Sequence, residues 1–285
     1  MNESEFIAAL RKLPLHPGAR GLEDDCAVLT IGGETLVITH DMMAEDTHFL
    51  SHADMADVAW KLLAANLSDL AAKGAGPIGV LLGHSLGSDD ARFLAGLDEG
   101  LRTYGVPIMG GDTVATTGTS TYGMTAIGRA AHLPVPSRKG AQPGDGIHVT
   151  GPVGRAMLGF EGDEDHLQAF NRPVPRLAEG IALAPHVSAM MDISDGLLLD
   201  CWRMAWVSGV TLAIDSAVVP VASRPRMQEC MRWGDDYELL FTAPEGAALP
   251  VPAFRIGTVR PRGSAPLLLD EAPLADPANL GYRHG

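Results

Sequence analysis

The sequence predicts an α/β protein of the α+β type, built from two domains. Apolar stretches with the length and residue types of strands alternate with stretches of helical periodicity, and this alternation is typical of sheets covered by helices. A length of 285 residues suggests one large domain or two of medium size. Residues 132–145, HLPVPSRKGAQPGD, are rich in proline, glycine and charge, as joints between domains commonly are. We therefore divide the chain into residues 1–135 and residues 136–285.

The first half is expected to begin with a short amphipathic helix. Asn2 is a plausible N-cap for it, and Phe6, Leu10 and Leu13 would share one face. The segment GLEDDCAVL (21–29) places two aspartates just before an apolar strand. Apolar and β-branched runs predict the remaining strands, and a longer segment between them predicts a helix. The strands are 35–43, 78–86, 106–115 and 121–130, and the helix is 89–104.

The second half shows the same alternation. The acidic segment GDEDHLQAF (162–170) is interpreted as a solvated loop. In SAMMDISDGLLLDCWRMAWVSG (188–209), a strand is expected to turn into a helix at Asp192–Gly196. WGDDYELLFTAP (233–244) has the pattern of a turn that leads into a strand. The other expected elements are strands at 146–151, 210–220 and 253–261 and a helix at 175–184.

One predicted helix, from Asp54 to the glycines at 74 and 76, organises the first half. Asp54 is a plausible N-cap, and Asp57 adds negative charge to the first turn. Val58, Leu62 and Ala65 recur with helical spacing, so they form the stripe that faces the core. The glycines and the proline that follows them are expected to end the helix.

The same helix carries three polar residues on a neighbouring face. Asn66, Asp69 and Lys73 lie at i, i+3 and i+7, and the residues around them are almost all small or apolar. Asp69 is therefore expected to be a buried carboxylate, which is unfavourable unless it is paired or holds a metal ion. Taken alone, Asp69 is better explained by a salt bridge or a hydrogen bond to neighbouring backbone.

Aspartates recur at the ends of the predicted strands. They are Asp25, at the start of a strand, and then Asp41, Asp112, Asp192 and the pair Asp235/Asp236. A single aspartate in such a place is more often a turn residue or a helix cap. The repetition, together with Asp69, favours a site for Mg²⁺, because carboxylate oxygens are ligands that this ion prefers, especially where it bridges phosphates.

Composition and missing motifs exclude several other classes of protein. The net charge of −14 argues against nucleic acid as a partner, and an acidic protein that handles anionic substrates needs metal cations as intermediaries. No apolar run approaches the length of a membrane span, and the first residues lack the pattern of a signal peptide. Cys26, Cys201 and Cys230 have no metal-binding spacing and fit a reducing cytoplasm.

Common phosphate-binding and catalytic motifs are also missing. The sequence has no P-loop, no dinucleotide-binding glycine motif, no paired zinc histidines and no nucleophile elbow. GPVGRAMLG has only a loose glycine spacing. Among the ten histidines only His48 is a candidate site residue, and an ordinary polar loop histidine is an equally good interpretation.

Six motifs, in order along the chain, carry a resemblance to a known family. They are GLEDDCAV, THDMMAEDTHF, NLSDLAAKGAGP, IMGGDT, MDISDGLLLD and GDDYELLF, which together extend from about residue 21 to residue 241. In this order they resemble thiamine-monophosphate kinase, a family within the superfamily of aminoimidazole ribonucleotide synthetase. The third, fifth and sixth motifs are specific to the kinase, whereas an aspartate in the central helix is general to the superfamily.

The resemblance implies a fold and an assembly. Each domain would be a sheet covered by helices, with a C-terminal α/β sandwich. The N-terminal domains of two subunits would pair into a β-barrel in a homodimer, and ATP would lie in clefts at the dimer interface. The composition, independently of the resemblance, predicts a cytoplasmic protein without nucleic-acid or membrane partners.

The resemblance also implies site residues. The metal-binding positions match Asp25, Asp41, Asp69, Asp112, Asp192 and Asp195, with Thr39 and His40 as neighbouring ligands. The positions that contact ATP match Gly111, Asp112, Arg138 and Ser194, with Tyr104 as a weaker match. Thiamine phosphate would lie near His48 and Asp235. Asp41, Asp69 and Asp112 would carry the catalysis, because phosphoryl transfer depends on charge neutralisation and in-line positioning.

Four positions depart from the family pattern. Glu23 stands in place of a glycine before the paired aspartates, and His40 replaces a threonine next to Asp41. Asp235 replaces a glutamate, and Asn279 aligns with an aromatic residue that packs on the substrate ring. The metal and ATP positions are thus well kept, and the pocket for the acceptor is less so.

The expected activity is the phosphorylation of thiamine monophosphate to thiamine diphosphate, with ATP as donor and Mg²⁺ as cofactor. Two alternatives stay open. One is another ATP-using enzyme of the superfamily that acts on a different small substrate, and the other is a catalytically silent homologue that binds nucleotide or metal. The sequence has no catalytic cysteine near a glycine-rich N-terminus, which argues against a selenophosphate synthetase.

Overall fold

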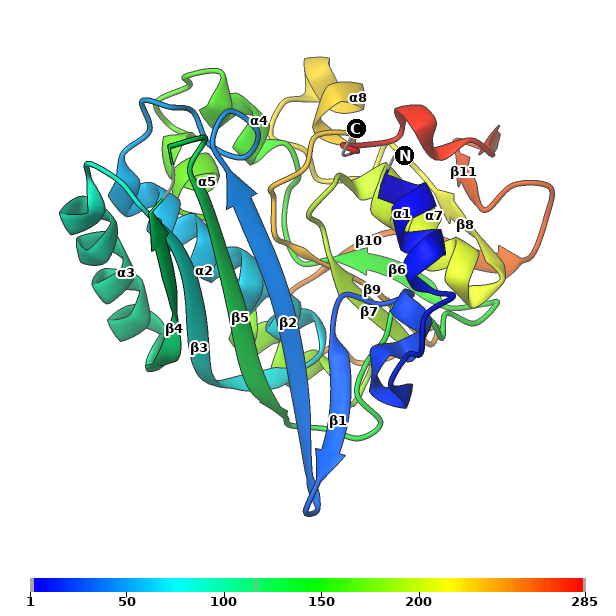
Figure 1. Cartoon of the computed structure of the whole chain (residues 1–285). Helices are drawn as coiled ribbons and strands as arrows, with labels where there is room; N and C mark the ends of the chain where they lie inside the picture. The colour runs from blue at the N-terminus through cyan, green and yellow to red at the C-terminus, as the bar shows by residue number, and fades with distance from the viewer. Residues whose placement is uncertain (1–2, 116, 284–285) are drawn as a thin grey trace.

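Two β-sheets with helices packed against them form the molecule (Figure 1). The computed structural model describes residues 3–115 and 117–283, so the expected cap Asn2 lies outside the described residues. The first helix, α1 (Glu3–Leu10), leaves Phe6 exposed, and Leu13 lies beyond its end, so the expected apolar face does not form. In Figure 1, α1 overlaps α7 (Leu197–Ser208) from the second half of the chain.

The first half of the chain forms a five-stranded sheet in the order β1-β2-β5-β3-β4. All neighbours are antiparallel except β3 and β4, which are parallel. Helix α2 packs on one face of this sheet, and α3 packs on α2. The predicted strands and helices of this half are confirmed to within a few residues. Their bounds are β1 (Ala27–Ile31), β2 (Glu34–Ala44), α2 (Met55–Ala72), β3 (Ala75–Leu86), α3 (Asp90–Tyr104), β4 (Ile108–Ala115) and β5 (Thr121–Ala130).

Strand β4 is an uncovered edge. All eight of its residues are exposed, among them the apolar residues Ile108, Met109 and Val114. Its close parallel pairing with β3 requires glycine at position 111, because a Cβ there would lie 1.9 Å from the carbonyl oxygen of Leu82. An exposed, apolar strand edge is unusual in a protein that remains a monomer.

The second half forms a seven-stranded sheet in the order β12-β11-β8-β10-β6-β9-β7. Only β8 and β11 are parallel neighbours. Helix α7 packs against this sheet, and the remaining helices are short. The strands are β6 (Gly146–Val149), β7 (Ala189–Asp192), β8 (Val210–Ile214), β9 (Leu239–Ala243), β10 (Phe254–Pro261), β11 (Leu267–Leu269) and β12 (Ala272–Leu274). The short helices are α4 (Arg155–Phe160), α5 (Leu167–Asn171), α6 (Leu177–Leu183) and α8 (Met227–Cys230), with 3₁₀ turns at Arg224–Arg226 and Pro277–Asn279. A further 3₁₀ turn, Pro17–Leu22, lies in the first half of the chain.

Several expectations for these elements need correction. The acidic segment 162–170 is not a loop throughout, because α5 begins inside it at Leu167. The strands expected at 146–151 and 210–220 end earlier, at Val149 and Ile214. Asp41 and Asp112 lie inside long strands and not at their ends. Helices α4 and α8 and strands β11 and β12 were too short to leave a periodic signal.

Helix α2 is buried on nearly all sides, as its composition predicts. Sixteen of its 18 residues are buried, and the Asp54 carboxylate caps it by accepting a hydrogen bond of 2.9 Å from the backbone N–H of Ala56. The helix ends at Ala72, two residues before Gly74, which has a φ of +58°. A Cβ at position 74 would lie 2.5 Å from the Cβ of Ala184, so glycine is needed both for the conformation and for the close approach.

The same helix takes part in two hydrophobic cores. Most of its apolar residues pack against the first sheet, whereas Ala71 and Ala72 pack with Leu239 and Phe241 of the second sheet. Gly180 of α6 permits this packing, because a Cβ there would lie 2.0 Å from the carbonyl oxygen of Ala71. Within the described residues, none of the helices has both the length and the apolar character that crossing a membrane requires.

Candidate functional site

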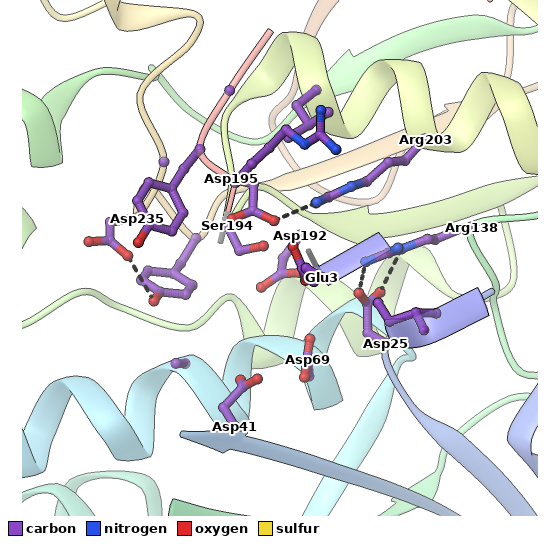
Figure 2. A pocket seen from close by; sticks show the side chains of 18 of the residues that line it. Glu3, Asp25, Asp41, Asp69, Arg138, Asp192, Ser194, Asp195, Arg203 and Asp235 are labelled. Atoms are coloured by element: carbon purple, nitrogen blue, oxygen red, sulfur yellow. Dashed lines mark hydrogen bonds and ion pairs between the residues drawn. The ribbon is translucent and has the colours of Figure 1, made fainter. Parts of the chain in front are cut away.

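A cavity of about 940 Å³ opens between the two sheets, where most of the expected site residues converge. Strand β2 contributes Asp41 and helix α2 contributes Asp69. The last residue of β7 contributes Asp192, and the turn that leads to α7 contributes Ser194 and Asp195. Figure 2 shows the first pair below the second group, with Asp235 at one end of the cavity and the Asp25–Arg138 pair at the other.

Three carboxylates meet in this cavity. Asp25, Asp69 and Asp192 each place one oxygen within 4.8 Å of the oxygens of the other two. Neighbouring hydroxyls fix two of these side chains, because Thr39 donates to Asp69 and Ser68 donates to Asp192 over 2.5 Å. Segments far apart in the sequence therefore bring a compact set of hard oxygen ligands together.

Burial and mutual repulsion make this cluster unfavourable when it is fully ionised. Burial, followed by the charges of neighbouring aspartates, raises the pKa of Asp41 to about 7. Burial and the charge of Asp25 raise the pKa of Asp192 to about 6, against the opposing hydrogen bond from Ser68. Burial and the charges of Asp41 and Asp192 raise the pKa of Asp69 well above its usual range. A divalent cation would remove this repulsion, and the donor set is one that suits Mg²⁺.

One edge of the cluster is already neutralised by basic side chains. Lys73 is fully buried and forms ion pairs with Asp24 and, over 3.1 Å, with Asp25. Arg138 forms a second ion pair with Asp25. Although burial opposes the change, the charges of Arg138 and Lys73 lower the pKa of Asp25. Lys73 lies directly after the last residue of α2, and its pairing with Asp24 could not be predicted from the sequence.

The turn after β7 is supported by groups that the sequence did not single out. Arg203 of α7 forms ion pairs with Asp195 and, over 3.0 Å, with the buried Asp200. Burial raises the pKa of Asp200 to about 7, although Arg203 opposes this shift. The backbone N–H of Tyr282 donates to the carbonyl oxygen of Asp195 over 2.9 Å, so the C-terminal segment also holds this turn.

The opposite end of the cavity combines one carboxylate with aromatic side chains. Asp235 has a φ of +64° and accepts a hydrogen bond of 3.1 Å from the hydroxyl of Tyr237. Its carboxylate also forms an ion pair of 2.6 Å with Lys61 of α2. Trp233 and Tyr282 line the same cavity. This end therefore suits a flat organic group that carries positive charge.

His48 and Asn279 were both expected near this end. His48 lines the cavity, and its Nδ1 accepts a hydrogen bond of 3.1 Å from the backbone N–H of Ala44. Asn279 is exposed and is not part of the cavity lining, and its carbonyl oxygen accepts a hydrogen bond of 3.1 Å from Arg232. The replacement of an aromatic residue by Asn279 predicted that the cavity would lack an aromatic ring. Tyr282, three residues later, lines the cavity and supplies such a ring.

Besides Asn279 and Thr39, four predicted site residues do not line the cavity. The His40 ring lies within hydrogen-bonding distance, 2.9 Å, of the Thr125 hydroxyl on the neighbouring strand. Tyr104 packs on Trp60 with 5.6 Å between the ring centroids, and burial raises its pKa to about 12. Gly111 and Asp112 lie on the exposed edge strand β4, which β3 and β5 separate from β2. Within the described chain, these residues and the acidic cluster do not form one site.

Comparison with known proteins identifies the family. Residues 23–130 match the family described as AIR synthase related protein, N-terminal domain. The thiamine-monophosphate kinase of Escherichia coli strain K12 is 35% identical over 253 residues, which cover 79% of this chain and 76% of that protein. The chain belongs to the thiamine-monophosphate kinase family. The thiamine-monophosphate kinase of Methanospirillum hungatei JF-1 is also 35% identical, over 91% of this chain and 92% of its own length.

A solved structure shares the whole fold with this member of the thiamine-monophosphate kinase family. The structure of AaThiL complexed with AMPPCP and TMP matches with a TM-score of 0.88 and 25% identity, and the match covers 100% of this chain and 97% of that one. The two motifs NLSDLAAKGAGP and MDISDGL, which resemble the kinase family, are the segments that carry Asp69 and Asp192 into the cavity.

Proposed function

We propose that the protein transfers the γ-phosphoryl group of ATP to thiamine monophosphate and releases thiamine diphosphate and ADP. The observation that carries this proposal is the meeting of Asp25, Asp69 and Asp192 in a cavity that also holds Asp235 and aromatic side chains at its far end. The family membership and the ability of AaThiL to bind AMPPCP and TMP together support the same reaction. The cavity between the sheets would thus accept both substrates.

The acidic cluster fits Mg²⁺, because its donors are closely spaced carboxylate oxygens, and burial and mutual repulsion raise the pKa of Asp69 and Asp192. The residues that would hold the ions are Asp25, Asp41, Asp69, Asp192 and Asp195, with Asp112 from strand β4. The bound ions would neutralise the phosphate charges and bridge donor and acceptor. Thr39 would not bind the ions directly but would orient the Asp69 carboxylate through the hydrogen bond that it donates.

The protein itself would mainly bind and orient the substrates. Ser194 and Arg138 lie where they could contact the triphosphate, and Arg138 would add a fixed positive charge beside Asp25. At the other end, Asp235 and His48 would hold the acceptor, with Tyr282 packed on its ring. The acceptor phosphate is already an anion near neutral pH, so this transfer needs no strong general base.

We also propose that residues 1–135 and 136–285 act as two domains and that the protein works as a homodimer. The exposed apolar strand β4 would pair with its counterpart, so that two five-stranded sheets close into a barrel. This arrangement would bring Gly111 and Asp112 of one subunit to the ATP site of the other. It accounts for the position of these two residues outside the cavity of their own chain.

The deciding experiment measures product formation from ATP and thiamine monophosphate, beside a panel of other phosphorylated acceptors. Thiamine diphosphate and ADP should form in equal amounts, and only when Mg²⁺ is present. Asp69→Asn should abolish this turnover while the protein stays folded, because the amide matches the shape of the carboxylate but cannot neutralise the metal ion. Turnover with a different acceptor would point to another enzyme of the superfamily, and ATP binding without any turnover would point to a silent homologue.

A further inference from the structure

Lys61 is a buried cation inside the cavity to which the sequence motifs assign no role. Its side chain is only 4% exposed, and it projects from helix α2 to the cavity. A buried ammonium group is unfavourable unless it is paired. Among the residues that the structure describes, Asp235 is the anion that pairs with it, over 2.6 Å. The ring of Phe170 lies beneath the ammonium group, 3.9 Å from Nζ to the ring centroid.

Asp235 is held in place independently of Lys61. Its backbone N–H donates to the carbonyl oxygen of Ser194 over 2.8 Å, and its other carboxylate oxygen accepts from Tyr237. Its side chain is 32% exposed, so the carboxylate remains open to the cavity. A cation that enters the cavity would therefore reach the same carboxylate that Lys61 now holds, and the two positive charges would repel each other.

The face of α2 that lines the cavity allows the Lys61 ammonium group a second position, nearer to the acidic cluster. Lys61, Ala65 and Asp69 are spaced by four residues and all line the cavity. The distance along α2 from Lys61 to Asp69 is about 12 Å. Ala65, between them, has only a methyl side chain, so no side chain of α2 blocks the way along this face. The four-carbon stem of lysine is flexible enough to turn its ammonium group toward the acidic cluster, where the phosphate of an acceptor must lie for transfer.

We propose that Lys61 determines acceptor specificity by exchanging ion-pair partners. In the empty cavity it neutralises Asp235. When an acceptor binds, the cationic ring of the acceptor takes Asp235, and the Lys61 ammonium group moves to the phosphate monoester of the same molecule. This inference rests on the proposed function and adds to it a residue whose pairing depends on both charges of the acceptor.

The exchange has a chemical consequence that can be tested. An acceptor with both charges leaves every group paired. Thiamine without phosphate would take Asp235 and leave Lys61 buried without an anion, so it would bind poorly. The difference in binding free energy between thiamine monophosphate and thiamine would therefore exceed the contribution that the attraction between the phosphate and the metal ions makes.

The test compares the dissociation constants of thiamine and thiamine monophosphate by titration calorimetry, with Mg²⁺ and a non-hydrolysable ATP analogue present. In the wild-type protein, thiamine should bind much more weakly than thiamine monophosphate. Lys61→Met should reduce this ratio of dissociation constants about tenfold or more, because it removes one charged hydrogen bond to the phosphate and one repulsion of the ring. Asp235→Asn should weaken both ligands alike and leave the ratio as in the wild type.

Two further variants keep the test decisive. Arg92→Met is a matched control, because it also removes a cation paired with an aspartate of the α2 region, Asp54, but lies outside the cavity. It should leave the ratio unchanged. If Lys61→Met does not fold, as judged by its thermal unfolding, Lys61→Met with Asp235→Asn avoids the unpaired carboxylate, and its ratio should fall as well.

The inference is overturned if the ratio in the Lys61→Met protein, or in the double variant, equals that of the wild type. Lys61 would then only hold Asp235 in place, and the affinities for both ligands would change in parallel. A failure of the proposed function looks different, since the wild-type protein would neither bind nor phosphorylate thiamine monophosphate.

Discussion

Asp41→Asn should abolish activity and yet stabilise the metal-free protein. The Asp41 carboxylate lies in the cavity opposite other carboxylates, and within residues 3–115 and 117–283 no side chain or backbone group donates a hydrogen bond to it. Its pKa is raised from 3.8 to about 7, first by burial and then by the charges of Asp192, Asp25 and Asp195. Asparagine has the same shape and no charge, so it removes the unfavourable ionisation.

The size and sign of the effect follow from this pKa. The folded protein binds the proton of Asp41 more tightly than the unfolded chain does. The contribution of this proton to the free energy of unfolding is therefore fully present below about pH 4 and is lost as the pH rises through 7. A shift of about 3 pKa units corresponds to about 4 kcal/mol. Because the neighbouring aspartates titrate together and share this cost, we expect Asp41→Asn to gain about 2–3 kcal/mol more at pH 8 than at pH 5.

The assay is urea unfolding in the presence of a chelator, at both pH values, for the wild type and the variant. Asp98→Asn serves as control, since Asp98 is exposed on α3 and pairs only with Arg102 among the residues described. Its effect should stay within about 0.5 kcal/mol at either pH. Adding Mg²⁺ should stabilise the wild type more than Asp41→Asn. The reasoning is refuted if Asp41→Asn lowers the free energy of unfolding at pH 8 without metal, because the carboxylate would then have a stabilising partner.

Three further predictions concern assembly and the acceptor. The protein should be a dimer at micromolar concentration by light scattering, and Ile108→Lys on β4 should yield a monomer with little activity; a fully active monomer would contradict the shared site. The Asp69→Asn and Asp112→Asn proteins should each be inactive. Mixing the two proteins under conditions that exchange subunits should restore about a quarter of wild-type activity, because half of the dimers would carry one intact site out of two. If no activity returns, both residues belong to a site within one chain. Tyr282→Ala should raise the Michaelis constant for thiamine monophosphate roughly 2- to 30-fold, because it removes about 0.5–2 kcal/mol of binding free energy, and it should leave the constant for ATP unchanged. An equal change for both substrates would show that Tyr282 does not contact the acceptor.

The sequence predicted those parts of the fold whose signal is local. Helix α2 was found because its cap, its apolar stripe and its terminal glycines lie within one stretch, and β5 was predicted to the residue. Asp69 was recognised as a buried carboxylate because its neighbours along the helix are apolar. Short elements such as α4 and β12 span too few residues to show a period, and their formation depends on the sheet against which they pack.

Pairings between distant residues could not be predicted in this way. Lys61 and Asp235 are both visible in the sequence, but nothing in their local patterns indicates that they meet. The same holds for Lys73 with Asp24, and for Tyr282, which lies at the cavity in place of the expected Asn279. Asp112 shows the opposite case, because its motif is recognisable while its own chain leaves it on an exposed edge strand. Under the proposed dimer, a second subunit would bring Asp112 to an ATP site.

The burial of α2 in both cores also sets the order in which the protein can fold during its synthesis. Phe241, which packs near Ala71, follows it by 170 residues in the sequence. At usual rates of translation, the C-terminal end of α2 would wait about 10–30 s for this partner. During that time the end of the helix exposes an apolar surface, to which a chaperone on the ribosome can bind. A nascent chain that ends near residue 135 should therefore be prone to aggregation, although it contains the whole first sheet.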